Sequence, residues 1–108
     1  MNPELRDLAL GELKPVHWRS FDGMEIWGLL LTPPGYSGGK KLPLLVYCHG
    51  GPIGGFTYGL FPQFMHTVPQ VDIYGTQAMA SAGMAVLFPM PRGGSGYGLE
   101  GFRMIKNA

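Results

Sequence analysis

Cysteine and charge are both scarce in this sequence. Cys48 is the only cysteine among 108 residues, which excludes an internal disulfide and a zinc site built from cysteine thiolates. Charged residues make up 14% of the chain, the formal net charge is +1, and no basic run is longer than Lys40-Lys41. Nucleic acids and anionic membranes are therefore poor candidates for partners.

Residues 42–71 contain no Asp, Glu, Lys or Arg, yet their pattern does not indicate a membrane span. Glycines, prolines and two histidines interrupt every apolar stretch of the roughly 20 residues that a spanning helix needs. The first residues also lack the basic start and the apolar run of a secretion signal. The visible start favours the cytoplasm, but the compartment stays open because a signal could precede Met1.

Glycine and proline, by contrast, are abundant, with 18 Gly and 10 Pro. Together with a hydrophobic content of 45%, they exclude both a helical bundle and a disordered tail. The length allows one domain, and no internal repeat is present. We expect strands, turns and loops to dominate.

Four segments have the pattern of β-structure. Residues 17–21 and 26–31 flank Asp22-Gly23, which predicts a β-hairpin. Residues 44–48 and 84–88 are apolar without alternation, which is typical of inner strands buried on both faces of a parallel sheet. The Pro- and Gly-rich residues between the hairpin and the first of these strands predict an exposed loop.

The helix pattern lies between the two apolar strands. Residues 76–82 are good helix formers, and Gly83 stands where a C-terminal cap belongs. A second helix is predicted to begin near Gly101. The order strand, helix, strand predicts an α/β fold, with a leading hairpin and one β-α-β unit of a mostly parallel sheet. We place the domain at residues 16–108, with residues 1–15 as a leader or linker.

The sharpest motif is H-G-G-P at residues 49–52, directly after an apolar strand. Backbone N–H groups aimed at a developing oxyanion accelerate acyl transfer, and glycine allows the backbone to approach that closely. Such a loop supplies half of the oxyanion hole in α/β-hydrolases. Gly50 and Gly51 are the candidate donors, and Gly51 is the better one. A plain tight turn explains the same glycines.

Several segments together resemble the start of the catalytic domain of the prolyl oligopeptidase family of serine peptidases, in its acylaminoacyl-peptidase and dipeptidyl-peptidase branch. The resemblance covers residues 16–108. It rests on the following motifs: F-D-G at 21–23, L-L-T-P-P-G-Y at 30–36, V-Y-C-H-G-G-P at 46–52, the segment 77–83, and P-R-G-G-S-G-Y-G at 91–98.

The resemblance implies a Ser-Asp-His hydrolase domain, usually following a β-propeller, that removes short units from the N-termini of peptides. The triad would lie beyond Ala108, in the family order of nucleophile, Asp and His. It implies no cofactor. Arg92 in the P-R-G segment is a candidate for substrate binding, although a guanidinium that braces the loop is the more frequent role. Met90, where an Asn is common, and the long stretch 53–74 depart from the family pattern.

Two other motifs compete for the same glycine-rich loop. Ser95 is flanked by Gly94 and Gly96, but Tyr97 breaks the G-x-S-x-G pattern of a nucleophile elbow. Residues 96–101 fit G-x-G-x-x-G, yet two prolines and Arg92 separate them from the preceding strand, and no acidic residue follows at the required distance. We favour neither a serine nucleophile nor a dinucleotide site here.

The histidines and aromatics point to structural roles. The three histidines lie in separate segments without metal-ligand spacing, so zinc is not expected. Cys48 and His49 are adjacent in a strand and point to opposite faces, so we expect Cys48 to be a buried core thiol. The aromatic residues of the long loop could line a substrate channel or pin the loop to the core; they are Phe56, Tyr58, Phe61 and Phe64.

Three functions remain open. A fragment of a serine peptidase, inactive alone because the triad is missing, agrees with all the motifs. An esterase or lipase of the same fold would use the same H-G-G loop. A truncated, non-catalytic interaction module is the third possibility. The remainder of the catalytic domain and a β-propeller are the expected protein partners of the first, and a peptide is its expected substrate.

Overall fold

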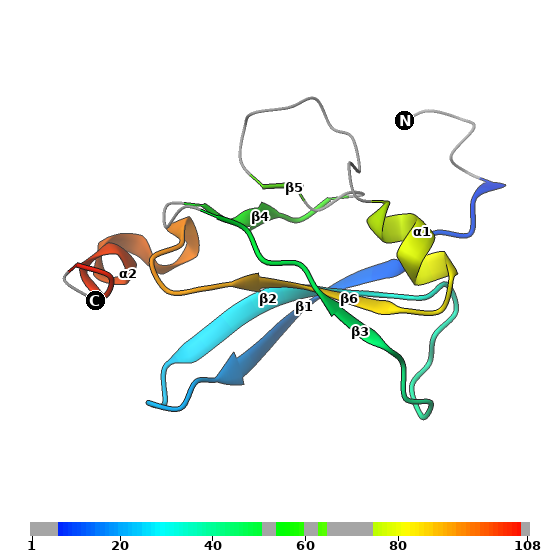
Figure 1. Cartoon of the computed structure of the whole chain (residues 1–108), viewed down its shortest axis with the longest axis horizontal. Helices are drawn as coiled ribbons and strands as arrows, with labels where there is room; N and C mark the ends of the chain where they lie inside the picture. The colour runs from blue at the N-terminus through cyan, green and yellow to red at the C-terminus, as the bar shows by residue number, and fades with distance from the viewer. Residues whose placement is uncertain (1–6, 51–53, 60–62, 65–74, 107–108) are drawn as a thin grey trace.

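The computed structural model describes residues 7–50, 54–59, 63–64 and 75–106, which form one four-stranded sheet with two short helices (Figure 1). The strand order in the sheet is β1-β2-β6-β3, and β4 and β5 form a separate two-stranded ladder. The elements are β1 (Glu12–Arg19), β2 (Glu25–Thr32), β3 (Leu44–Val46), β4 (Phe56–Thr57), β5 (Gln63–Phe64), α1 (Thr76–Ser81), β6 (Ala85–Met90), the 3-10 helix η2 (Ser95–Tyr97) and α2 (Gly98–Arg103).

The predicted hairpin is confirmed. β1 and β2 pair antiparallel from Arg19 opposite Glu25 to Glu12 opposite Thr32. The turn is closed by the Gly23 N–H, which donates to the Ser20 carbonyl at 2.9 Å, while the Asp22 carboxylate accepts from a backbone N–H two residues later. β1 begins ahead of the boundary that we placed at residue 16, because every residue from Glu12 onward has a partner in β2.

The predicted helix over residues 76–82 is also confirmed, as α1, and it ends in the predicted way. The Gly83 N–H donates to the Ala80 carbonyl at 2.9 Å and the Met84 N–H to the Met79 carbonyl at 3.2 Å, which is a Schellman motif. Gly83 adopts φ +94, a conformation that glycine reaches without steric cost. The cap turns the chain directly into β6.

β3 pairs parallel with β6, as expected for a β-α-β unit, but it is not an inner strand. It lies at the edge of the sheet, and Leu44 and Val46 are 55% and 49% exposed. The prediction that residues 44–48 are buried on both faces is therefore wrong for this chain. An apolar run indicates a strand whose side chains and free edge are normally covered by neighbouring elements. The described residues contain no strand beyond β3 that could cover it.

Pro89 explains why the parallel ladder is so short. Alternate residues of β6 face β3, and the Ala85 N–H donates to the Pro43 carbonyl at 2.9 Å. The donors that would follow Ala85 along this edge are Leu87 and then Pro89. Pro89 has no N–H, so the ladder cannot continue there. On its other side β6 pairs antiparallel with β2. The described sheet is thus mixed, and only the pair of β3 and β6 has the parallel arrangement expected from sequence.

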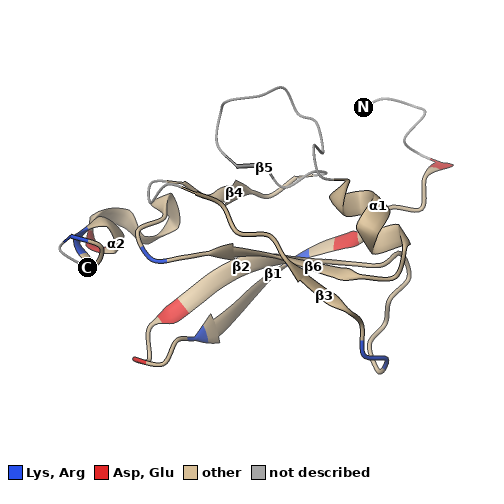
Figure 2. Ribbon diagram, viewed as in Figure 1, with Lys and Arg blue, Asp and Glu red and all other residues tan. Residues whose placement is uncertain are grey.

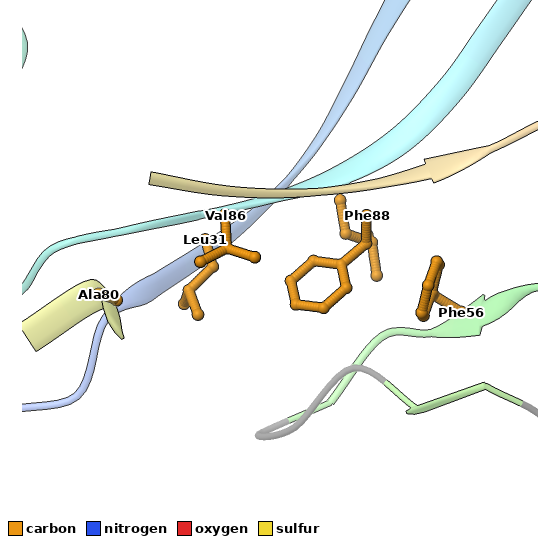
Figure 3. Packing of buried hydrophobic residues seen from close by; sticks show 6 residues of the cluster. Leu31, Phe56, Ala80, Val86 and Phe88 are labelled. Carbon is orange, nitrogen blue, oxygen red and sulfur yellow. The ribbon is translucent and has the colours of Figure 1, made fainter. Parts of the chain in front are cut away.

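The core lies on one face of the sheet, between the strands and α1 with β4 (Figure 3). Leu29 lies opposite Phe88 in the register, and Leu31 lies opposite Val86, so these four side chains share a face. Ala80 from α1 and Phe56 from β4 complete the buried cluster. Burial of these side chains supplies the main stabilisation of the fold.

A hydrogen bond also joins α1 to the sheet. The Gly11 N–H donates to Gln77 Oε1 at 2.8 Å, which links the start of β1 to α1. Lys, Arg, Asp and Glu lie ahead of β1, on the hairpin, near α2 and in the loop before β3 (Figure 2). None of the helices in the described part is long and apolar enough to cross a membrane.

Candidate functional site

The candidate oxyanion loop starts where the chain leaves the parallel pair. The Tyr47 N–H donates to the Leu87 carbonyl at 2.8 Å, and this bond extends the ladder one residue beyond β3. Gly50 follows at the carboxyl end of the strand, is exposed, and has no atom within 4 Å of the position that a Cβ would occupy. Ligands of α/β sheets bind beyond the carboxyl ends of the strands. Gly51 lies outside the described residues.

Aromatic side chains anchor this loop on both sides. Tyr47 precedes it and Phe56 follows it, and their ring centroids lie 5.4 Å apart. Each also contacts Phe88 in the core, at 5.7 Å and 5.1 Å. His49 packs edge-on against Phe56, with centroids 5.1 Å apart. Phe56 therefore pins the loop to the core, which is the second of the two roles considered for the loop aromatics.

The other aromatics of the loop differ. Tyr58 is exposed, and its hydroxyl donates to the Leu13 carbonyl at 3.0 Å, which links the loop to β1. Phe61 lies outside the described residues, and the side chain of Phe64 is not described. A channel-lining role for them remains a prediction.

Cys48 is exposed, so the expectation of a buried core thiol is wrong. β3 ends at Val46, and no described strand lies on its free side. Cys48 therefore lies beyond the paired part of an edge strand, where the sequence predicted an inner one. His49 beside it is half-buried, in agreement with the expected alternation.

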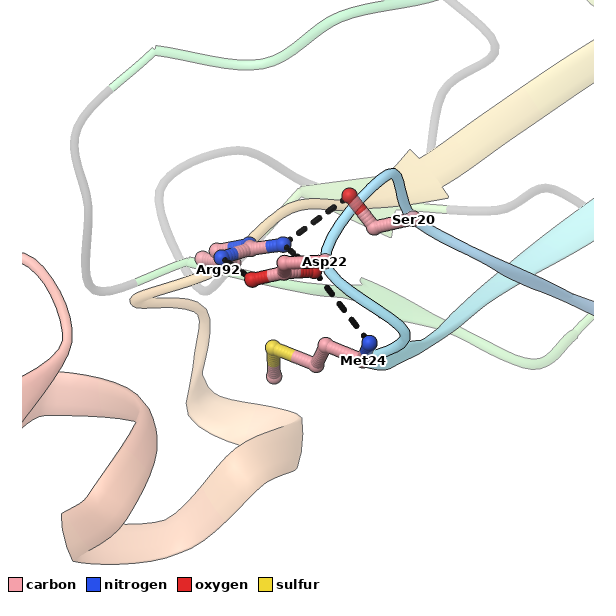
Figure 4. Close-up of polar contacts among 4 residues, drawn as sticks. All are labelled: Ser20, Asp22, Met24 and Arg92. Atoms are coloured by element: carbon pink, nitrogen blue, oxygen red, sulfur yellow. Dashed lines mark hydrogen bonds and ion pairs between the residues drawn. The ribbon is translucent and has the colours of Figure 1, made fainter.

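Arg92 braces the hairpin turn (Figure 4). Its two terminal nitrogens donate to the two carboxylate oxygens of Asp22, and Nη2 also donates to Ser20 Oγ at 2.9 Å. The guanidinium carbon lies 5.5 Å from the centroid of the Phe21 ring, within range of a cation–π contact. These contacts use three of the five guanidinium N–H groups and brace the loop, while the substrate-binding role of Arg92 remains a prediction.

The ion pair changes the titration of Asp22. Hydrogen bonding to Arg92 is the largest cause that lowers the pKa of Asp22 from 3.8 to about 2, and the pair raises the pKa of Arg92 above its ordinary value. No sequence pattern indicates this pair, because the partners are 70 residues apart.

We expect the ion pair between Arg92 and Asp22, called the clamp from here on, to stabilise the fold in a pH-dependent way. Because the pKa of Asp22 is lower in the folded state, its contribution is complete above about pH 4 and disappears as the pH falls through 2. Arg92→Lys loses the bidentate geometry, so local melting of the hairpin should begin a few degrees lower at pH 7, with a smaller difference at pH 2. Fluorescence of the two hairpin tryptophans, Trp18 and Trp27, reports this local change at protein concentrations below the micromolar range, where self-association is limited.

Arg103→Lys is the matched control for this experiment. Arg103 pairs with Glu100 one turn away in α2, and both side chains are 71% exposed. Such a surface pair contributes little, so its melting temperature should match the wild type. An equal effect of the two substitutions at both pH values would contradict a specific clamp.

Tyr97 joins the end of the P-R-G-G-S-G-Y-G loop after β6 to the sheet. Its hydroxyl accepts from the Trp27 N–H at 3.0 Å and donates to the Met90 carbonyl at 2.7 Å. Trp27 and Met90 are the last pair in the register between β2 and β6. The hydroxyl therefore closes the ladder where the strands end, and the residue that breaks the nucleophile-elbow pattern has a structural role.

The two glycine-rich loops meet. The Ser95 N–H donates to the Gly54 carbonyl at 3.2 Å, two residues after the end of H-G-G-P. A Cβ on Gly94 would lie 2.9 Å from the same carbonyl oxygen, and a Cβ on Gly55 would lie 3.0 Å from Ser95 Oγ. The sequence did not show that the two motifs are in direct contact. The glycine pairs 54–55 and 93–94 were the available indication of a close backbone approach.

Metal and cofactor sites were not expected from sequence. No group of three His, Cys, Asp or Glu able to hold a metal lies within the part of the chain that the structure describes. Residues 96–101, which fit the dinucleotide-binding pattern, form η2 and the start of α2. A dinucleotide site instead needs a tight turn that leads from a strand directly into a helix.

Peptidases resemble this chain in sequence. It is 28% identical over 96 residues to the uncharacterized peptidase YuxL of Bacillus subtilis, and 26% identical over 99 residues to dipeptidyl-peptidase 5 of Aspergillus fumigatus. These matches cover 89% and 91% of this chain but only 13% and 12% of the relatives. The chain thus spans about an eighth of their length. No family model matches it.

Solved structures of peptidases resemble its fold. Pyrococcus horikoshii acylaminoacyl peptidase matches with a TM-score of 0.59 and 31% identity, over 87% of this chain and 13% of that one. The isopeptidase AtxE2 matches with a TM-score of 0.54 and 26% identity, over 81% of this chain and 12% of that one.

Proposed function

The chain is related to a segment of the prolyl oligopeptidase-family peptidases, and on that premise we propose that it forms the first part of the catalytic domain of a serine peptidase. Its contribution is the oxyanion loop. The observation that carries the proposal is the contact between the loop after β3 and the P-R-G-G-S-G-Y-G loop after β6, both at the carboxyl ends of parallel strands.

The proposed role of Gly50 and Gly51 is to donate backbone N–H groups to the oxygen that becomes negative when serine attacks a peptide carbonyl. Such donors are most effective when they are fixed before the reaction. Anchoring of the loop by Tyr47 and Phe56 on Phe88, and the bond between Ser95 and Gly54, support this role. Gly51 is the preferred donor.

The nucleophile, its base and the orienting carboxylate are supplied, in this proposal, by the remainder of the catalytic domain. Serine attacks the carbonyl, histidine takes and returns the proton, and aspartate holds the histidine. The residue after the serine supplies the second oxyanion donor. The peptidase activity therefore belongs to the assembled domain, and the isolated chain is inactive.

The proposed substrate is a peptide cleaved near its N-terminus. The names of the relatives carry this choice, since acylaminoacyl and dipeptidyl peptidases are among them. An acylaminoacyl peptidase similar to this chain was solved with a peptide chloromethyl ketone bound. A β-propeller domain is the expected partner in the complete enzyme. An esterase or lipase is the alternative within this fold, because the oxyanion loop serves both chemistries.

The proposal can be tested in a hybrid peptidase, in which this chain replaces the matching segment of Pyrococcus horikoshii acylaminoacyl peptidase. A folded hybrid that hydrolyses acylaminoacyl or peptide p-nitroanilides supports the peptidase role. A folded hybrid with no hydrolysis of these substrates contradicts it. Hydrolysis of p-nitrophenyl esters alone would favour the esterase alternative.

We expect the isolated chain to show no reaction with a fluorophosphonate probe and no hydrolysis of aminoacyl or ester substrates. Ser95 is exposed at the start of η2, where a turn with Tyr97 replaces the strained elbow that activates a nucleophile. Intact mass spectrometry of the treated chain measures the result, and the active hybrid is the positive control. An adduct mapped to Ser95 would contradict the assignment.

A further inference from the structure

Gly94 and Ser95 contact Gly54 in the loop that follows H-G-G-P, and we propose that they are positioning residues for the oxyanion donors. This inference rests on the proposed function. Neither residue touches substrate in the proposed mechanism. Each would act through Gly54, which lies three residues after Gly51 in the sequence.

The first contact is a close approach between backbones. A Cβ on Gly94 would lie 2.9 Å from the Gly54 carbonyl oxygen and 3.0 Å from that of Pro91. Both atoms belong to the backbone, so neither can move aside as a flexible side chain would. Gly94 has φ −67 and ψ 158, a conformation open to any residue. Glycine is therefore required at this position by space and not by its dihedral angles.

The second contact is the hydrogen bond from the Ser95 N–H to the Gly54 carbonyl at 3.2 Å. Gly54 and Gly94 are both buried, whereas Ser95 is exposed, so the acceptor of this bond lies inside the fold and the donor lies at its surface. Together, the close approach and the bond fix both the distance and the direction of the Gly54 carbonyl.

Hydrogen bonds hold this loop to the sheet on both sides of the contact. Arg92, two residues before Gly94, is bound to the hairpin turn through Asp22 and Ser20. Tyr97, two residues after Ser95, is bound to the ends of β2 and β6. The loop is thus held on both sides of Gly94 and Ser95, the two residues that contact Gly54. Displacement of a positioned group by about 1 Å can cost up to 100-fold in rate.

Two pairs of variants in the hybrid peptidase separate this role from general stability. Gly94→Ala places a methyl group against Gly54, whereas Gly96→Ala, with no atom within 4 Å of its Cβ, is the matched control. Ser95→Pro removes the N–H, and the extended Gly94 before it suits a proline. Ser95→Ala keeps the N–H and is the control for that change.

We expect Gly94→Ala and Ser95→Pro each to lower kcat about 10-fold with little change in KM, while the two controls keep the wild-type kcat. In a Gly51→Pro background, neither variant should lower kcat further, because the donor that they position is already lost. This double-mutant cycle is a readout that a purely structural role would not produce.

The outcomes separate the two proposals. Wild-type kcat in both variants, or additive losses in the Gly51→Pro background, would overturn the positioning role and leave the oxyanion role intact. A wild-type kcat for Gly51→Pro itself would overturn both. If the hybrid or Gly94→Ala fails to fold, hydrogen exchange of residues 54–59 in the full chain decides, measured below the micromolar range to limit self-association. Faster exchange in Ser95→Pro than in Ser95→Ala supports the contact, and equal exchange overturns it.

Discussion

The isolated chain is expected to self-associate at micromolar concentration and to lack a single cooperative thermal transition. The cause is β3, an edge strand of three apolar residues, Leu44–Val46, with two of its side chains about half exposed. An unprotected edge offers unpaired N–H and C=O groups to another chain. At about 25 cal/mol per Å², the surface left uncovered forfeits several kcal/mol, comparable to the stability of a small domain.

The opposite edge of the sheet, β1, is protected against pairing with another chain. β1 carries Lys14, Pro15 and Arg19, and charge and proline are the usual means of keeping an edge strand unpaired. β3 has none of these residues. Association should therefore proceed through β3, and the rest of the proposed catalytic domain should suppress it by covering that strand.

Light scattering of the chain and of two variants measures this expectation. Val46→Lys places a charge on the β3 edge and should shift the population toward the monomer. Leu99→Lys also removes an exposed apolar side chain, but from α2 and away from the sheet, so it should leave association unchanged. A wild-type monomer with one cooperative transition would contradict the prediction and favour a self-sufficient interaction module.

Gly51→Pro in the hybrid peptidase should lower kcat by about 100-fold or more, with little change in KM. Proline removes the backbone N–H, and loss of one oxyanion donor costs roughly this factor because the bond is strongest in the transition state. Steady-state kinetics with a peptide p-nitroanilide measures the two constants.

Gly51→Ala is the matched control, since it keeps the N–H at the same position. Its kcat should lie well above that of Gly51→Pro. Equal losses in the two variants would mean that glycine is needed here for the turn alone, and an unchanged kcat in Gly51→Pro would remove the loop from the mechanism. Circular dichroism confirms that each hybrid is folded before the rates are compared.

Local patterns of residues were enough to predict the local elements. Asp22-Gly23 between apolar runs specified the hairpin, and Gly83 after a run of helix formers specified the end of α1, because turn and cap conformations depend on a few adjacent residues. The order of strand, helix and strand gave the parallel pairing of β3 with β6. The motifs of the two glycine-rich loops were sufficient to identify relatives among peptidases.

Contacts between distant residues became known only from the folded structure. The pairing of Arg92 with Asp22, the bond from Ser95 to Gly54, and the edge position of β3 that leaves Cys48 exposed all join or separate segments far apart in the chain. A residue pattern encodes the conformation and the burial that a segment prefers. It does not encode which partner satisfies that preference, since the partner is chosen only when the whole sheet assembles.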